Sequence, residues 1–242
     1  MDSVSASTTA ITSTIGWYGK LPALGDFAGR RLPESFIRPW DQWLANSVMQ
    51  TKQALGEHAS DALLTFPIWR FVLPRRLIDD NAWLGAMLPS VDRVGRCFPL
   101  TVALPLPESF GAIGQLGQIG QSNLPPLNSL HAQLKPLVEA ALRVVDDDDV
   151  EAFDAHIIAT STRFESHPQQ SIPSHGESLN ELLLAIGARL ASSHLSGESL
   201  WWSGEITESH LTINTNRDSA PGRLFRWPGQ LDSQLFARLL EG

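Results

Sequence analysis

The clearest hydrophobic pattern in the chain is a stripe of large apolar side chains, spaced three or four residues apart, between residues 36 and 48. Its members are Phe36, Trp40, Trp43, Leu44 and Val48. This spacing predicts an α-helix with one face in a core. Pro39 suits the first turn of that helix, where its missing N–H costs nothing. Residues 35–38 then form either part of the helix or a separate turn.

Short apolar runs bounded by turn residues predict β-strands. In the first half of the chain they cover residues 15–18, 69–73, 83–88 and 97–104. A polar connection over residues 89–96 separates the last two runs. In the second half, two runs predict a pair of strands, at residues 199–203 and 211–214.

The second half is richer in helical patterns. Apolar positions between residues 134 and 145 share one face, and Pro136 is expected to mark the start of that helix. Two capping boxes, in which a capping residue is followed three positions later by an acid, predict further helices. They are Asp148 with Glu151, before apolar residues 153–157, and Ser178 with Glu181, before residues 182–190. A last helix is expected to begin at Asp232, with Leu235, Phe236 and Leu239 inward.

Strands and helices interleave in both halves, which predicts an α/β layered fold with a sheet covered by helices. Residues 1–14 are rich in Ser and Thr and predict a flexible tail, followed by a single domain over residues 15–242. Glycine recurs at every third position from Gly111 to Gly120. Residues 108–126 are therefore interpreted as a loop or linker and as the best position for an internal boundary.

The composition narrows the classes of function. The chain has 242 residues, 43% hydrophobic and 18% charged, and a formal net charge of −8. This charge argues against a general nucleic-acid-binding surface and against electrostatic adhesion to anionic lipid. The tail lacks the basic start and apolar core of a signal peptide, and no apolar run approaches the roughly 20 residues of a membrane helix. We therefore expect a soluble cytoplasmic protein with no direct membrane insertion.

Few residues qualify for metal or covalent chemistry. Cys97 is the only cysteine, which excludes an intramolecular disulfide and a cysteine-based zinc cluster, and we interpret it as inert. The histidines form no His-Glu-x-x-His motif, and the acidic run 146–149 lacks the alternating ligands of a calcium loop. No Gly-x-Ser-x-Gly elbow is present, although a triad assembled from distant residues stays open. The sequence predicts no metal, no cofactor and no catalytic residue.

The segment 16–27 contains the dipeptide Gly19-Lys20, which invites comparison with a phosphate-binding loop. That motif needs a glycine five residues before its second glycine and a Ser or Thr after the lysine. Thr14 and Leu21 occupy these two positions. We therefore expect no ATP or GTP binding by this route.

Seven charged residues in this segment, just after it and in the later polar connection form the main candidate site. They are Lys20, Asp26, Arg30, Arg31, Asp92, Arg93 and Arg96. Charges set among apolar residues need partners when buried, so one interpretation is a structural ion-pair network that holds two loops together. The other is a binding surface whose guanidinium groups receive a carboxylate or phosphate of a partner.

Trp201 and Trp202 form a second candidate site. Adjacent residues of a strand face opposite ways. One of the two is expected in the core and the other on an accessible face, where it would be available as an interface anchor.

Two segments together resemble the signatures of the TagF (ImpM) family of bacterial type VI secretion. The first runs from Gly16-Trp17-Tyr18-Gly19-Lys20-Leu21-Pro22 through Gly25-Asp26-Phe27 and Arg30-Arg31-Leu32-Pro33 to Trp40-Asp41-x-Trp43-Leu44. The second is Pro89-Ser90-Val91-Asp92-Arg93-Val94-Gly95-Arg96 with Phe98-Pro99-Leu100. Cys97 stands where the family is associated with an aromatic residue, a departure that bears on packing. The C-terminal resemblance rests mainly on residues 199–202.

The resemblance implies a layered αβα sandwich with a mixed sheet flanked by helices. It also implies a non-enzymatic accessory protein, a post-translational regulator and usually a repressor, that acts by protein–protein interaction. The implied partner is a cytoplasmic scaffold with a forkhead-associated domain, and other type VI components are further candidates. Some relatives carry a fused metal-dependent phosphatase. This chain has neither the spare length nor the acidic motifs for one, so a stand-alone form is expected.

Two other functions stay open. The protein could be a structural component of the secretion apparatus. Alternatively, it could be a small-ligand-binding protein or an enzyme that uses Lys20, Asp26, Asp92, Arg93 and Arg96. This last function requires a cleft in which the five charged groups converge without pairing off entirely.

Overall fold

One sheet of seven strands organises the parts of the chain that the structure describes. The structure is a computed structural model and describes residues 14–106, 127–143, 149–161, 198–204 and 223–241. The strands lie in the order β2-β1-β5-β4-β3-β6-β7. Their bounds are β1 Gly16–Lys20, β2 Phe27–Arg30, β3 Trp69–Leu73, β4 Trp83–Leu88, β5 Leu100–Pro105, β6 Glu198–Ser203 and β7 Leu224–Pro228.

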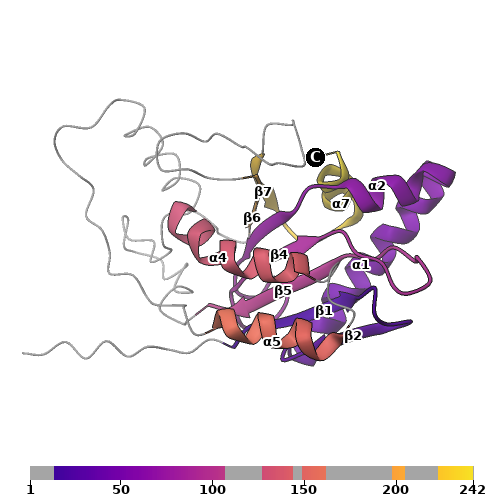
Figure 1. The fold of residues 1–242 in the computed structure, drawn as a ribbon. Coiled ribbons are helices and arrows are strands. Elements are labelled where there is room, and N and C mark those ends of the chain that lie inside the picture. Colours follow the sequence, from indigo (N-terminus) through magenta and orange to yellow (C-terminus); the bar gives the residue numbers. More distant parts are fainter. Residues whose placement is uncertain (1–13, 107–126, 144–148, 162–197, 205–222, 242) are drawn as a thin grey trace, which may run out of the picture.

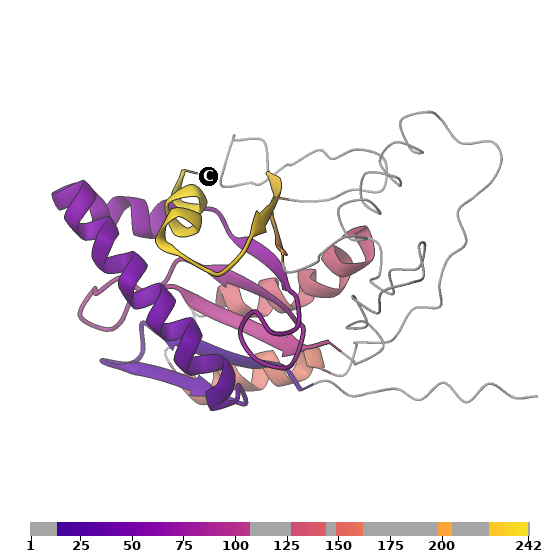
Figure 2. The ribbon, with the colours of Figure 1, turned by 180° about the vertical axis from the view of Figure 1, so that it is seen from behind.

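Helices cover both faces of this sheet. They are α1 Glu34–Leu55, the 3₁₀ turn η1 Gly56–His58, α2 Ala59–Thr65, α4 Leu127–Leu142, α5 Val150–Ser161 and α7 Ser233–Leu240. One face packs against α4 and α5 (Figure 1). The other face packs against α1, α2 and α7 (Figure 2). The layered αβα arrangement expected from the sequence is confirmed.

Strand alternation divides the apolar side chains between two cores. In β3, Trp69, Phe71 and Leu73 join the core under α1, whereas Val72 joins the core under α4. Every residue of β3 and of β4 is buried, because both faces of these central strands are covered. This is why each of them appears in the sequence as an almost unbroken apolar run, and why the bounds of both were predicted correctly.

Trp40 connects helix α1 to the centre of the sheet. Its fully buried ring lies 5.3 Å from the ring of Phe36 and 5.0 Å from that of Phe71. Its indole N–H donates to Thr101 Oγ1 at 2.8 Å. The ring therefore contributes its apolar area without leaving a buried donor unpaired. This contact fixes α1 over β5.

The pairing within the sheet differs from the expected mixed sheet. All strand pairs among the described residues are antiparallel. Strands β3, β4 and β5 are consecutive in the chain and adjacent in the sheet. Antiparallel neighbours can be joined by short connections, whereas a parallel pair needs a crossover of about a dozen residues or more.

Two prolines lie deeper inside helices than the sequence predicted, which placed Pro39 in the first turn of its helix and Pro136 at the start of its own. Helix α1 already begins at Glu34, before Pro39, and α4 at Leu127, before Pro136. A proline inside a helix removes one backbone hydrogen bond and crowds the preceding turn. Burial of the preceding apolar side chains outweighs this cost here. These side chains are Phe36 in α1 and Leu130 and Leu134 in α4.

The last two helices show how caps decide helix starts. The Asp232 carboxylate accepts a hydrogen bond from the Leu235 backbone N–H at 2.9 Å, which confirms the predicted start of α7. At α5, Asp149 Oδ1 accepts from the Glu151 backbone N–H at 3.2 Å. The predicted cap, Asp148, lies outside the described residues, as does the helix expected at 182–190.

The edge strands are the part of the sheet that the sequence analysis missed. Strand β2 is short and largely exposed, and β7 is only half-buried, so neither carries a strong apolar run. The expected partner of β6, residues 211–214, lies outside the described residues, and so does segment 108–126. Strands from both sides of that segment belong to the same sheet. A single domain over residues 15–242 stays a prediction.

Trp201 and Trp202 are both buried, so the expectation that one of them is accessible is wrong. They do face opposite ways: Trp201 joins the core under α1 and Trp202 the core under α4. Strand β6 lies between β3 and β7, and helices cover both faces. Neither ring is available as an interface anchor in this structure.

Gly85 of β4 tests the close packing of the sheet. A Cβ atom there would lie 2.5 Å from Phe71 Cζ and 2.6 Å from the Val102 carbonyl oxygen. We expect Gly85→Ala to lower the free energy of unfolding by about 1–3 kcal/mol, the usual cost of overpacking. Gly25→Ala is the control, because its Cβ would meet only Arg93 Nη2 at 3.6 Å. Equal unfolding midpoints for both variants in urea would contradict this packing.

Candidate functional site

The two signature segments meet where β1 ends and β5 begins, because these two strands are antiparallel neighbours. The chain leaves β1 at Lys20 and enters β5 at Leu100, so the loop after β1 and the loop before β5 emerge side by side. Gly19 permits this approach. Its φ is +150°, and a Cβ atom there would lie 2.5 Å from the Pro99 carbonyl oxygen. A larger residue would push the two loops apart.

Asp92 is the centre of the site. Its side chain has no exposed surface. Oδ2 accepts hydrogen bonds from Lys20 Nζ at 2.9 Å and from Arg96 Nε at 2.6 Å. Oδ1 accepts from the backbone N–H groups of Val94 at 3.1 Å and of Arg96 at 2.8 Å. Both carboxylate oxygens are therefore satisfied, as a buried charge requires.

These partners decide the charge state of Asp92. Burial by itself raises the pKa of the carboxyl group, because the charged form loses water. The hydrogen bonds from Lys20, from the Arg96 backbone and side chain and from the Val94 backbone act in the opposite direction and prevail. They hold the pKa of Asp92 well below its usual range. The network is therefore charged at neutral pH.

The same network joins the two loops. Arg96 Nη2 donates to the Gly25 carbonyl oxygen at 2.6 Å, and the Arg93 backbone N–H donates to the Leu24 carbonyl oxygen at 2.7 Å. Ser90 Oγ donates to the Lys20 carbonyl oxygen at 2.6 Å. One interpretation offered by the sequence, an ion-pair network between two loops, describes Lys20, Asp92 and Arg96 in this structure.

The other four members of the charged cluster lie elsewhere. Asp26 is exposed, and its Oδ1 accepts a hydrogen bond from the Phe27 backbone N–H at 2.8 Å. The Arg93 side chain is exposed near Gly25. Neither forms an ion pair with another described residue. The sequence analysis grouped all seven charges as one candidate site, because the sequence does not show which way each side chain points.

Arg30 and Arg31 connect the β2 edge to helix α5. Arg30 Nη2 lies 2.6 Å from Glu151 Oε1 on the surface. Arg31 forms a bidentate pair with Asp154, with nitrogen–oxygen distances of 2.8 and 2.5 Å. The Trp17 indole N–H also donates to Asp154 at 2.7 Å. Arg31, together with the Trp17 hydrogen bond, lowers the pKa of the Asp154 carboxyl group.

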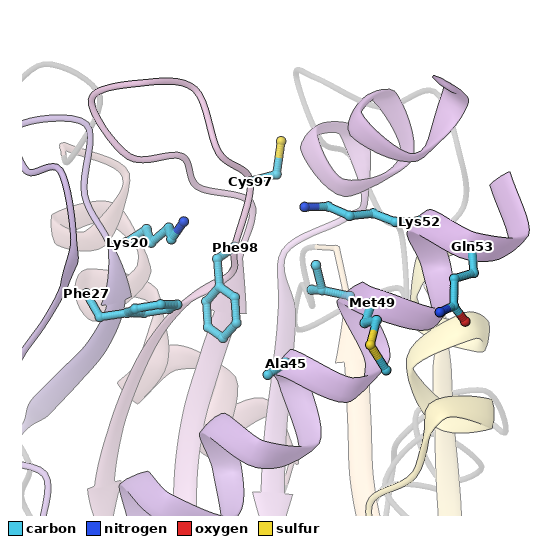
Figure 3. Close-up of a pocket in the computed structure, with 9 residues that line it drawn as sticks. Lys20, Phe27, Ala45, Met49, Lys52, Gln53, Cys97 and Phe98 are labelled. Carbon is cyan, nitrogen blue, oxygen red and sulfur yellow. The ribbon is translucent and has the colours of Figure 1, made fainter. Parts of the chain in front are cut away.

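A cavity of about 490 Å³ opens beside the Asp92 network, between α1 and the loops (Figure 3). We call it the α1 groove, and its lining residues are Lys20, Phe27, Ala45, Val48, Met49, Lys52, Gln53, Cys97 and Phe98. The sequence analysis missed its α1 wall. The signal was the exposed side of the amphipathic helix, where Met49 interrupts a polar face.

Two further observations apply only to the described part of the chain. No group of three or more His, Cys, Asp or Glu residues is arranged to hold a metal ion there. Nor does any helix there combine the length and apolar character needed to cross a membrane.

Comparison with known proteins identifies a family and a similar solved structure. Residues 16–159 match the family described as TagF N-terminal domain, type VI secretion system-associated. Among solved structures, the chain is similar to PA0076 from Pseudomonas aeruginosa PAO1, with 30% sequence identity, a TM-score of 0.61 and coverage of 94% of each chain. A search of curated proteins finds no match.

The two lysines of the groove provide a matched test of the network. Removing one partner of a buried ion pair costs about 3–5 kcal/mol, and Arg96 remains beside Asp92 to offset part of this. We expect Lys20→Met to lower the free energy of unfolding by about 3 kcal/mol. Lys52 is exposed, so Lys52→Met should change it by less than about 0.5 kcal/mol. Similar denaturation curves for both variants would contradict a structural role for Lys20.

The depressed pKa of Asp92 predicts a dependence on pH. The unfolded chain binds a proton at Asp92 near its ordinary pKa of about 3.9, whereas the folded chain resists protonation to lower pH. The stabilisation is therefore complete above about pH 4 and is lost as the pH falls toward the folded pKa. We expect the difference in unfolding free energy between wild type and Asp92→Asn to shrink below about pH 4. A difference that stays constant from neutral to strongly acidic pH would contradict this assignment.

Proposed function

The chain belongs to the type VI secretion-associated TagF family, and from this premise we propose that it is a cytoplasmic, non-enzymatic regulator of secretion. It acts after translation, as a repressor, by binding a scaffold protein that contains a forkhead-associated domain. Other components of the apparatus are further candidate partners. The proposal rests on family membership together with the mutual pairing of Lys20, Asp92 and Arg96.

One observation supports binding over catalysis: three of the signature charges, Lys20, Asp92 and Arg96, are occupied by one another. Lys20 and Arg96 both bind Asp92, and Arg96 also binds the opposite loop. A general base or nucleophile needs a free position toward a substrate. Both oxygens of Asp92 instead accept hydrogen bonds within the protein. Such residues fix the shape of a surface.

The alternative of an enzyme or small-ligand site required five charged groups to converge unpaired in one cleft. Asp92 pairs with Lys20 and Arg96, while Asp26 and Arg93 are exposed outside the network. The α1 groove receives only Lys20 from this set. The arrangement does not support a reaction built on these five groups.

Titration of the purified chain with the purified scaffold tests the proposal. We expect a saturable complex by isothermal titration calorimetry, with a dissociation constant on the order of 10 μM or tighter, typical of a regulatory contact. An isolated forkhead-associated domain from an unrelated protein is the control and should not bind. No detectable heat at several tens of micromolar of both proteins would contradict direct binding.

A further inference from the structure

The α1 groove combines exposed apolar side chains with positive charge. Phe27 and Met49 are 41% and 51% exposed, although both are large apolar residues. Phe98, which is 5% exposed, lies between them in the view of Figure 3. Exposed apolar side chains gathered around a cavity, in contrast to isolated ones, are typical of a binding site.

The aromatic wall of the groove is held by contacts within the protein itself. The Phe27 ring meets the Phe98 ring edge-on at 4.7 Å and stacks on Tyr18 at 5.9 Å. Tyr18 is itself held by a 2.7 Å hydrogen bond from its hydroxyl group to Asp41. Preorganised aromatic side chains lose little entropy on binding and are frequent anchors of protein interfaces.

The charge at the groove is opposite to that of the whole chain. The lining includes two lysines and no acidic residue, although the chain has a formal net charge of −8. Figure 3 shows Lys20 and Lys52 extending toward each other from opposite walls. Lys20 is bound to Asp92, but Asp92 also faces Arg96, so that cluster keeps one excess positive charge.

Lys52 is the available cation of this groove. It lies in the last turn of α1 and is exposed. No ion pair joins it to another described residue. An unpaired ammonium group beside an apolar cavity favours a ligand that has an apolar part next to an anionic part.

We propose that the α1 groove binds an acidic protein segment, in which one large apolar side chain enters between Met49 and Phe98 and a neighbouring carboxylate pairs with Lys52. This inference rests on the proposed function, because it names the surface that the regulatory partner uses. The apolar anchor supplies affinity, and the charge pairing selects acidic segments over others. A second copy of this acidic chain is the competing occupant that the experiment must distinguish.

The experiment uses the full chain and two kinds of probe. The first is a fluorescein-labelled, N-acetylated peptide of alternating Asp, Glu and Leu, compared with versions in which lysine replaces the acids or serine replaces leucine. The second is the purified scaffold. Met49→Asp and Lys52→Glu are the groove variants. Their matched controls are Ile158→Asp, at a site 48% exposed on α5, and Arg143→Glu, exposed after α4.

We expect the acidic peptide to bind at least about tenfold more tightly than either altered peptide, and each groove variant to weaken it about three- to tenfold. The two controls should bind like wild type. Affinity should fall when NaCl is raised, because added salt screens the exposed pair. The bound peptide should also slow labelling of the Cys97 thiol by a maleimide, since Cys97 lines the groove and is the only cysteine.

The two probes separate the inference from the proposed function. If the scaffold binds wild type and the groove variants equally, the inference is overturned while the proposed function stands. If the scaffold does not bind but the acidic peptide shows the expected pattern, the proposed function fails, while the binding of acidic segments by the α1 groove stands. No preference for the acidic peptide would overturn the inference. So would a dimer in analytical ultracentrifugation that Met49→Asp dissociates, because a second copy would then occupy the groove.

Discussion

A buried carboxylate between two cations holds the distinctive part of this molecule together. The Asp92 side chain has no exposed surface, and it binds Lys20 from the end of β1 and Arg96 from its own loop. Taking such charges out of water is costly unless every hydrogen-bonding position is filled. The hydrogen bonds from Lys20, Arg96 and Val94 fill these positions and link the two loops. The aromatic wall of the α1 groove and the position of Lys20 both depend on this arrangement.

The fold supplies the frame in which the network can form. Antiparallel pairing of β1 with β5 brings together two loops that are some seventy residues apart, from Lys20 to Asp92. Helix α1 crosses the same region, held by Trp40 through its contact with Thr101. The opposite wall of the groove is therefore positioned by the core, and not by the loops themselves. The apolar core thus positions the α1 wall of the groove, and the ion network positions the loops opposite it.

The sequence predicted the central elements well because burial on both faces leaves a strong pattern, as in β3 and β4. It failed where the pattern is weak or ambiguous. Strand β2 is exposed at an edge, and the prolines of α1 and α4 are tolerated because packing outweighs a lost hydrogen bond. The predicted ion-pair network allows Lys20 to pair with Asp92. It does not predict that Arg30 and Arg31 pair with acidic residues of helix α5. The partners of these two arginines lie at least 121 positions away in the sequence. Tertiary structure decides such contacts, and hydrophobic periodicity and motif spacing carry no information about them. At β6 the opposite directions of Trp201 and Trp202 were predicted correctly, but strand alternation does not show that both faces of the sheet are covered, and both rings are buried.

The central claim is that the signature charges shape a docking surface and do not themselves act on a substrate or partner. The double substitution Lys20→Met with Asp92→Asn tests it most directly, because it neutralises the buried pair, leaves the local net charge unchanged and keeps an acceptor for the loop N–H groups. The measurement is the affinity of this variant for the scaffold, with hydrogen exchange of residues 90–98 as the check that the loop is intact. Where the loop stays intact, the account predicts an affinity within about threefold of wild type, since groups that only support the surface contribute little to binding. A loss of more than about tenfold, in a variant whose loop exchanges as slowly as that of wild type, would contradict it.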